Sequence, residues 1–97
     1  MFRHVVVLTF AEDATDAQVT AVVEGLRALP AQIPELRGYE VGRDLGLEGG
    51  DARVVAVADC DDVDGYLAYR DHPAHQRVIA ERIRPILAAR TAVQHER

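Results

Sequence analysis

Residues Phe2–Phe10 read FRHVVVLTF, and residues Ala52–Cys60 read ARVVAVADC. Both runs are rich in β-branched and aromatic residues, which is typical of β-strands. A strand with one face in water alternates between apolar and polar residues. These two strands carry apolar side chains on both faces, so both faces of their sheet should be covered. On one of the two faces the apolar residues are Val5, Val7, Val55 and Val57, which we call the second apolar set.

An amphipathic helix is expected after the first strand. Thr15 and Gln18 have the spacing of a capping box, and apolar residues then recur at the positions of one helix face. Pro30 marks the end of this helix. The apolar face consists of Val19, Val22, Val23, Leu26 and Leu29.

The rest of the chain predicts two more strands and two more helices. A short helix is expected over residues 63–70, and a second helix should begin at Pro73 and be kinked or ended by Pro85. A glycine-rich turn precedes the strand at Ala52–Cys60. The two remaining expected strands are Leu36–Arg43 and Thr91–Glu96.

The order β-α-β-β-α-α-β within 97 residues predicts a single α+β domain over residues 1–97. This order suits a ferredoxin-like four-stranded antiparallel sheet with helices on one face. A parallel sheet covered on both faces is excluded because there are too few helices. Leaving the second apolar set in water would forgo roughly 1.5–3 kcal/mol for each valine. The sequence therefore predicts a homodimer through the face that bears Val5, Val7, Val55 and Val57.

Composition limits the partners. Eleven basic residues against sixteen acidic ones give a net charge of −5, and the scattered basic residues form no stripe that follows phosphates. A nucleic-acid partner is therefore not expected. No apolar run is long enough for a membrane span or a signal peptide, so no membrane partner is expected. The lone Cys60 fits a reducing, cytoplasmic location, and basic residues that are all Arg fit a bacterial high-GC genome.

Candidate chemistry lies in the stretch YRDHPAH, residues 69–75, together with His4. His75 precedes apolar residues of its helix by three and four positions, and His4 shares a strand face with apolar residues. We therefore expect both imidazoles to face a cavity between sheet and helix. A neutral imidazole is a competent general base, and the Tyr69 phenol can donate to a developing oxyanion. In the competing interpretation these residues serve only the fold.

Other motifs predict structure rather than chemistry. His72 is a neighbour of a helix N-cap, and Asp61 and Asp62 are expected to cap the short helix. Cys60 should be a buried, inert thiol. No metal site is predicted, because His72-x-x-His75 lacks a carboxylate at ligand spacing. The sequence has no phosphate-cradling glycine spacing and no GxSxG or Walker pattern, which excludes nucleotide enzymes and serine hydrolases.

The segments RHVVVLTF, VGRDLGL, ARVVAVADCDD and YRDHPAH resemble the stress-responsive A/B barrel (Dabb) domain family over essentially the whole chain. The resemblance implies a ferredoxin-like protomer whose sheets pair in a dimeric α/β barrel. Within the family, the chain is similar to polyketide cyclases of the olivetolic acid cyclase type, which need no cofactor. This similarity implies His75 as the base, Tyr69 as the hydrogen-bond donor and His4 as a supporting group. The sequence departs from the cyclase pattern at Val54 and Cys60.

Three functions stay open at this point. The first is a cofactor-independent cyclase, or a related proton-transfer catalyst, acting on a small hydrophobic or aromatic, polyketide-like molecule. The second is a non-catalytic stress-responsive dimer with a structural or ligand-binding role. The third is a cofactor-free monooxygenase of the same dimeric barrel architecture.

Overall fold

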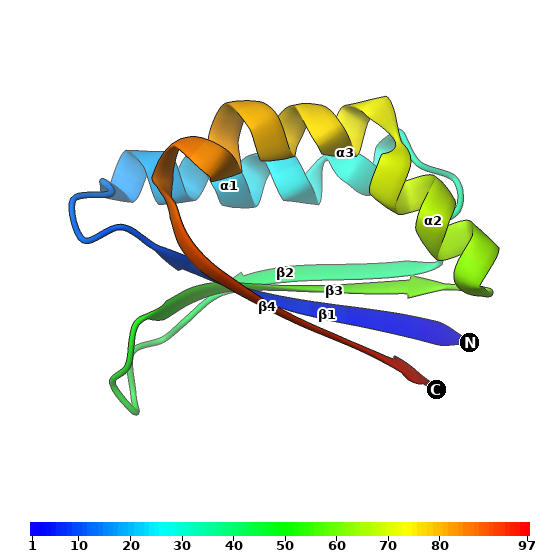
Figure 1. Ribbon diagram of the computed structural model, residues 1–97, viewed down its shortest axis with the longest axis horizontal. Coiled ribbons are helices and arrows are strands. Elements are labelled where there is room, and N and C mark those ends of the chain that lie inside the picture. The colour runs from blue at the N-terminus through cyan, green and yellow to red at the C-terminus, as the bar shows by residue number, and fades with distance from the viewer.

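The computed structural model describes residues 1–51 and 53–97, so Ala52 at the start of the third expected strand lies outside the described residues. The chain forms one antiparallel sheet with strand order β2-β3-β1-β4, and its helices cover one face (Figure 1). This arrangement confirms the predicted ferredoxin-like α+β fold. The strands are β1 (Phe2–Phe10), β2 (Gly38–Arg43), β3 (Ala52–Cys60) and β4 (Leu87–Glu96).

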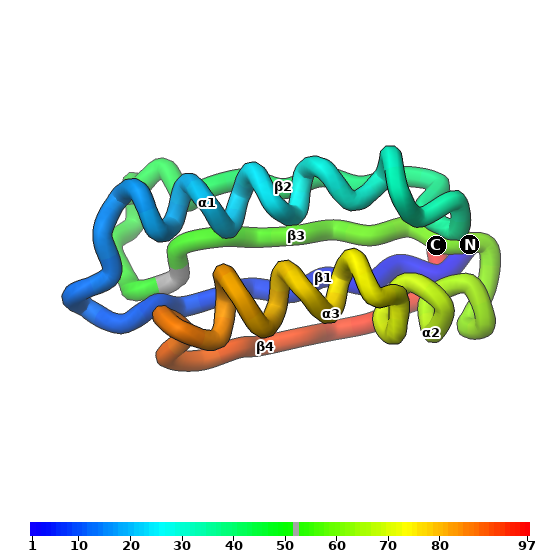
Figure 2. Tube along the Cα trace, turned by 90° about the horizontal axis from the view of Figure 1, so that it is seen from above, coloured from blue at the N-terminus to red at the C-terminus, as the bar shows by residue number. Residues whose placement is uncertain are grey.

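The helices form a single layer above the sheet. Figure 2 shows α1 running along the β2 and β3 side, and α3 running along the β1 and β4 side. Within residues 1–51 and 53–97, no helix combines the length and apolar character needed to cross a membrane. The helical elements are α1 (Asp16–Arg27), the 3₁₀ turn η1 (Leu29–Ala31), α2 (Val63–Asp71), α3 (Pro73–Val78), the π-helical turn η2 (Ile79–Ile83) and the 3₁₀ turn η3 (Arg84–Ile86).

The start of α1 confirms the predicted capping box. The Thr15 hydroxyl accepts a hydrogen bond from the Gln18 amide at 3.1 Å, and the Gln18 side chain accepts one from the Thr15 amide at 2.8 Å. These two bonds satisfy backbone donors that have no partner inside the helix. The helix ends at Arg27, close to the end predicted from Pro30.

Two predicted strand boundaries are wrong. The last strand begins at Leu87, four residues before the predicted Thr91, because Pro85 ends the helix and a single 3₁₀ turn leads directly into the sheet. The second strand begins at Gly38 rather than Leu36, since the Leu36 amide is used in a turn that bonds it to the Ile33 carbonyl. The earlier start of β4 places residues 87–90 on the sheet.

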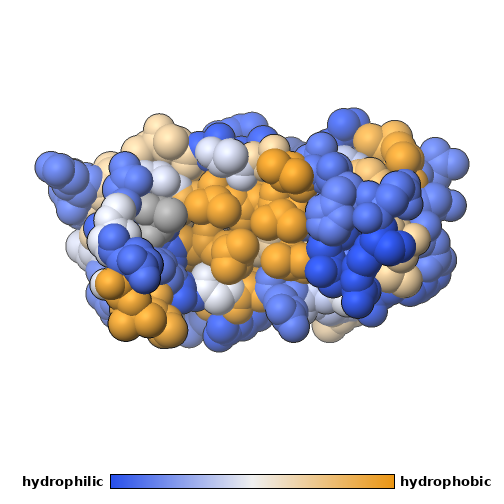
Figure 3. All heavy atoms as spheres, turned by 90° about the horizontal axis from the view of Figure 1, so that it is seen from below, coloured by the Kyte–Doolittle hydropathy of each residue, from blue (hydrophilic) through white to orange (hydrophobic). Residues whose placement is uncertain are grey.

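The two faces of the sheet differ in burial. On the helix-covered face, alternate residues of β1 are buried, beginning with His4 and ending with Phe10. The opposite, open face carries the predicted valines as two cross-strand pairs, Val5 with Val57 and Val7 with Val55. Val55 is 37% exposed. Figure 3 shows a hydrophobic patch at the centre of this face.

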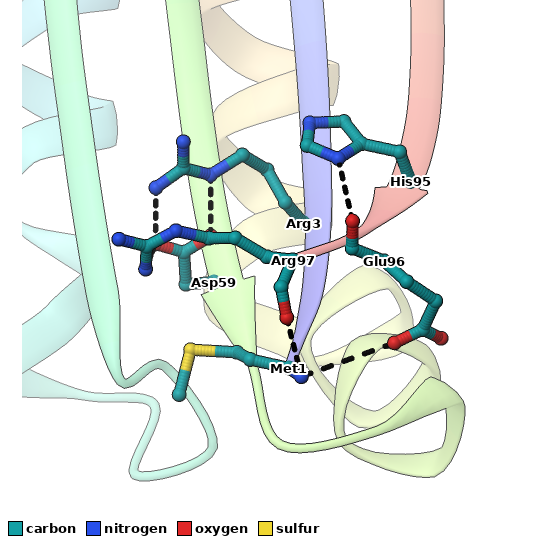
Figure 4. Close-up of polar contacts among 6 residues, drawn as sticks. All are labelled: Met1, Arg3, Asp59, His95, Glu96 and Arg97. Carbon is teal, nitrogen blue, oxygen red and sulfur yellow. Dashed lines mark hydrogen bonds and ion pairs between the residues drawn. The ribbon is translucent and has the colours of Figure 1, made fainter.

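One end of the open face is polar, as Figure 3 shows at the side where the two chain ends lie. Arg3 makes two hydrogen bonds to the Asp59 carboxylate, at 2.8 and 2.9 Å, and Arg97 adds a third contact at 3.4 Å (Figure 4). The Arg3 guanidinium lowers the pKa of Asp59 below its ordinary value. The Met1 amino group bonds the Arg97 carbonyl at 3.3 Å, so the two chain ends meet here. An ionic cluster thus borders the valine surface.

Candidate functional site

A cavity of about 280 Å³ lies between the helix-covered face of the sheet and the segment from α2 to η3. Its apolar wall includes Val6, Leu8, Ile79, Ile83 and Leu87. Three polar residues singled out in the sequence, His4, Tyr69 and His75, all line it. A larger hollow of about 450 Å³, beside Val7 and Val55 on the open face, contains none of these residues. The smaller, more enclosed cavity is therefore the candidate site.

His75 is held in one tautomer by the backbone. Its Nδ1 lies 3.0 Å from the Arg70 carbonyl oxygen, which also accepts a bond from the Gln76 amide at 2.7 Å. A carbonyl oxygen only accepts hydrogen bonds, so Nδ1 carries the proton and Nε2 carries the lone pair. Burial lowers the pKa of His75, which favours the neutral ring. The half-buried ring thus has Nε2 as its basic atom.

The helix start positions this imidazole. Pro73 is the first residue of α3, and His72 caps the helix because its Nδ1 accepts a bond from the Ala74 amide at 3.1 Å. His72 is thus the cap itself rather than the neighbour of one. The cap leaves His75 in the first turn of α3, next to the carbonyl at the end of α2.

Tyr69 contacts both His75 and a third residue, Tyr39. The Tyr69 and His75 rings stack, with centroids 4.3 Å apart and an angle of 22° between the planes. The Tyr69 hydroxyl lies 3.2 Å from the Tyr39 hydroxyl. Burial raises the pKa of Tyr69, and it raises the pKa of Tyr39 to about 12, so both phenols are neutral. When Tyr39 donates to Tyr69, the Tyr69 proton is free for a ligand.

His4 has the opposite tautomer to His75. Its Nδ1 accepts a hydrogen bond from the Gln94 side-chain amide at 2.8 Å, so its proton lies on Nε2. Burial, followed by the charges of Arg90 and His75, lowers the pKa of His4 to about 4. His4 is 4% exposed and its ring packs on Tyr66, with centroids 4.8 Å apart. The cavity therefore has one imidazole suited to accept a proton and one suited to donate a hydrogen bond.

Sequence reasoning missed several polar residues that complete this cavity or support its side chains. Gln94 and Arg90 lie opposite His4 and Leu8 in the pairing of β1 with β4. The face of Arg90 would have followed from the strand pattern if β4 had been predicted to begin at Leu87. Gln94 lay within the predicted strand, and only its pairing with His4 was missed. Tyr39 pairs with Ala58 on β3, so it also lies on the helix-covered face.

The remaining motifs have structural roles. Asp62 caps α2 through a 2.8 Å bond from the Gly65 amide, as predicted. The prediction that Asp61 also caps this helix is wrong, because its carboxylate forms an ion pair with Arg37 at 3.1 Å. Cys60 is fully buried, as predicted, and burial raises the pKa of its thiol. Among the described residues, no three potential ligands from His, Cys, Asp or Glu come together as a metal site.

Comparisons with known proteins agree with this architecture. A curated stress-response A/B barrel domain-containing protein from Arabidopsis thaliana is 32% identical over 78 residues, which cover 76% of this chain and 67% of that protein. A solved structure from Thermobifida fusca, described as a dimeric ferredoxin-like protein of unknown function, is 45% identical with a TM-score of 0.88. The match covers 97% of this chain and 88% of the Thermobifida fusca chain.

A hydroxynitrile lyase from Passiflora edulis shares the fold at 16% identity and a TM-score of 0.81, with 97% of this chain and 90% of that one covered. Residues 2–96 match the family described as the Stress responsive A/B Barrel Domain. This match covers almost the whole chain, including every element that lines the cavity. The protein therefore belongs to the stress-responsive A/B barrel domain (Dabb) family.

Proposed function

We propose that this Dabb protein is a homodimer whose cavity binds a small hydrophobic or aromatic, polyketide-like molecule and transfers a proton on it without a cofactor. His75 is the general base, Tyr69 is the hydrogen-bond donor and His4 supports it. The observation that carries the proposal is the bond between His75 Nδ1 and the Arg70 carbonyl, 3.0 Å long. It leaves Nε2 as the proton acceptor of a ring that shares an apolar cavity with Tyr69.

The reaction class follows from these roles. His75 Nε2 takes a proton from a carbon next to a ligand carbonyl, and the electron pair of that C–H bond moves onto the carbonyl oxygen as an enolate. Tyr69 donates a hydrogen bond to this oxygen, and His4 Nε2–H is a second donor. The enolate carbon then forms a bond to a second carbonyl carbon of the same molecule. The resulting alkoxide takes a proton back from His75, which completes an intramolecular aldol addition.

The dimer part of the proposal rests on the open face. The valine pairs Val5–Val57 and Val7–Val55 lie on this face, whose apolar centre water would otherwise meet (Figure 3). The solved relative from Thermobifida fusca is described as dimeric. Face-to-face packing of two such sheets buries the valines of both copies and leaves each helix-covered cavity on the outside of the pair.

A structural or ligand-binding dimer without catalysis is the second candidate. It is favoured by the Tyr39–Tyr69 hydroxyl contact and by the stacking of Tyr69 on His75, since both use the candidate groups inside the protein. In that case the two residues contribute mainly to stability. Loss of a buried hydrogen bond costs about 1–3 kcal/mol, which unfolding experiments resolve.

Deuterium exchange on phenylacetone, a small aryl ketone, tests the proton-transfer step. In D₂O, ¹H NMR should show that the wild-type protein accelerates loss of the protons next to the carbonyl. His75→Ala should abolish the acceleration and Tyr69→Phe should reduce it, whereas His95→Ala, at an exposed position outside the cavity, should retain it.

Two results would favour the structural candidate. One is wild-type exchange no faster than buffer, and the other is full activity in His75→Ala. Urea unfolding of the same variants completes the comparison, because losses above about 2 kcal/mol for His75→Ala and Tyr69→Phe indicate a role in the fold.

A further inference from the structure

We infer that the ligand of this cavity carries a carboxylate, which Arg90 and Arg84 bind at the solvent side while its apolar body lies among the aliphatic side chains. The inference rests on the proposed function, since it names the class of molecule that the same cavity takes. It is carried by the placement of two arginines, both of which are exposed and line the cavity.

The fold brings these arginines to the cavity from two different elements. Arg90 lies opposite Leu8 in the β1–β4 pairing, so its side chain leaves the edge strand on the helix-covered side. Arg84 is the first residue of η3, the 3₁₀ turn that connects the helical layer to β4. Because the chain between them contributes Leu87 to the apolar wall, a ligand can meet apolar and cationic groups together.

Five arginines of the chain are paired with carboxylates, but among the described residues these two are not. Within the part of the chain that the structure describes, neither Arg84 nor Arg90 takes part in an ion pair or a side-chain hydrogen bond. Arg70, which also lines the cavity, is paired with Asp71 at 2.9 Å. The other arginines with carboxylate partners are Arg3, Arg37, Arg43 and Arg97. The two free guanidinium groups are therefore available to an external anion.

The cavity is electropositive although the chain is acidic overall. None of the described residues that line it is an aspartate or glutamate, whereas the chain has a net charge of −5. The charge of Arg90 contributes to the lowered pKa of both His4 and His75, so this guanidinium is close to both rings. Both imidazoles are neutral and leave that charge uncompensated.

A carboxylate fits this environment. The planar guanidinium donates two parallel hydrogen bonds to a carboxylate, and such charge-assisted bonds are about twice as strong as neutral ones. A volume of about 280 Å³ suits a molecule of one or two rings rather than a long chain. The acid group therefore orients the ligand, with its apolar body against the aliphatic wall that the cavity shares with Tyr69 and His75.

Calorimetric titration with 2-naphthoate and its neutral analogue 2-naphthamide tests the inference. Naphthoate should bind the wild-type protein about 10-fold more tightly than naphthamide. Added salt should weaken naphthoate binding and so reduce this difference in affinity. Arg90→Gln and Arg84→Gln should each weaken naphthoate binding several-fold and leave naphthamide binding unchanged. Arg77→Gln is the matched control, since Arg77 is exposed on α3 outside this cavity and its replacement removes the same charge.

Equal binding of both compounds would overturn the inference, as would binding of neither, or a loss in Arg77→Gln equal to that in Arg90→Gln. These outcomes are separate from those of the exchange experiment. Equal binding of naphthoate and naphthamide, together with His75-dependent exchange, would retain the proposed function and reject the carboxylate. Arg90-dependent naphthoate binding without exchange on phenylacetone would retain the carboxylate site and reject the proton transfer.

Discussion

Neighbouring residues of one strand have opposite surroundings in this protein. Val54 on β3 is 1% exposed beneath the helices, whereas Val55 is 37% exposed on the open face. Both are valines in a regular strand, so neither side-chain chemistry nor local backbone distinguishes them. The difference arises only because helices cover one face. An apolar residue on the other face therefore marks a surface that needs a partner, which the proposed homodimer would supply.

The polar groups on the two faces differ as well. On the helix-covered face, the polar groups that pack beneath the helices are neutral and bonded to one another, as in the His4–Gln94 and Tyr39–Tyr69 contacts. The charged Arg90 is exposed. On the open face, the corresponding cluster is ionic and centres on Asp59. Burying a charge costs more than burying a neutral hydrogen-bonded group. The covered face thus has the electrostatics of an enclosed site, and the open face keeps its charges at the border of the apolar centre.

The largest effect is expected for a charge placed in the centre of the open face. Val55→Asp puts a carboxylate of each protomer into the valine interface, where it loses its hydration, so the dimer Kd should rise at least about 1000-fold. Sedimentation velocity at micromolar concentration should show a monomer. Val63→Asp is the control, because Val63 is 51% exposed on α2 and away from this face. A dimeric Val55→Asp protein would contradict the proposed interface.

Acid should destabilise the protein through the covered face. His4 has a pKa of about 4 in the folded protein against an ordinary value of 6.5, so between these values only the unfolded chain binds the proton. The free energy of unfolding should therefore fall by about 2–3 kcal/mol as the pH drops from 6.5 to 4, with His75 adding in the same direction. Urea unfolding at several pH values measures this.

The His4→Gln variant should lose most of that pH dependence, whereas His95→Gln should keep it. His95 is exposed at the polar end of the open face. A pH profile that is the same in His4→Gln and in the wild-type protein would show that other groups cause the acid sensitivity.

A matched pair of truncations compares the two faces directly. Val54→Ala leaves a gap in the packed core, so it should lower the free energy of unfolding by about 2 kcal/mol at any protein concentration. Val55→Ala should cost less, and its cost should grow with protein concentration as the wild-type dimer becomes populated. Chemical unfolding at low and high protein concentration distinguishes the effects of the two variants. Equal, concentration-independent losses would mean that Val55 is not in an interface.

The smallest effect concerns the two tyrosines. The contact between the Tyr39 and Tyr69 hydroxyls should give a coupling energy of about 0.5–1.5 kcal/mol. A double-mutant cycle of Tyr39→Phe, Tyr69→Phe and the combined variant in urea measures it. Additive effects would show that the hydroxyls do not interact, and that Tyr69 does not depend on Tyr39 for its orientation.

The sequence predicted those parts of the structure that depend on local pattern. The capping box at Thr15, the two-faced strands and the placement of His4 and His75 on the helix-covered side all follow from residue type and periodicity. The first residue of β4 could not be placed, because residues 87–90 read LAAR, which favours a helix as readily as a strand. Because of that error, Arg90 lay outside the predicted strand and was not assigned to a face of the sheet. The Tyr39–Tyr69 contact joins residues 30 apart, and only the packing of α2 over the sheet brings them together.

The meeting of the two chain ends, described above at the polar end of the sheet, makes the polypeptide almost a closed ring. The Arg97 amide bonds the Met1 carbonyl at 2.8 Å, and Gly46, Gly49 and Gly50 form an exposed turn between β2 and β3. A short linker across the ends, with a new opening at that turn, would therefore give a circularly permuted protein with every strand pairing retained. Such a permutant would begin at β3 and end at β2.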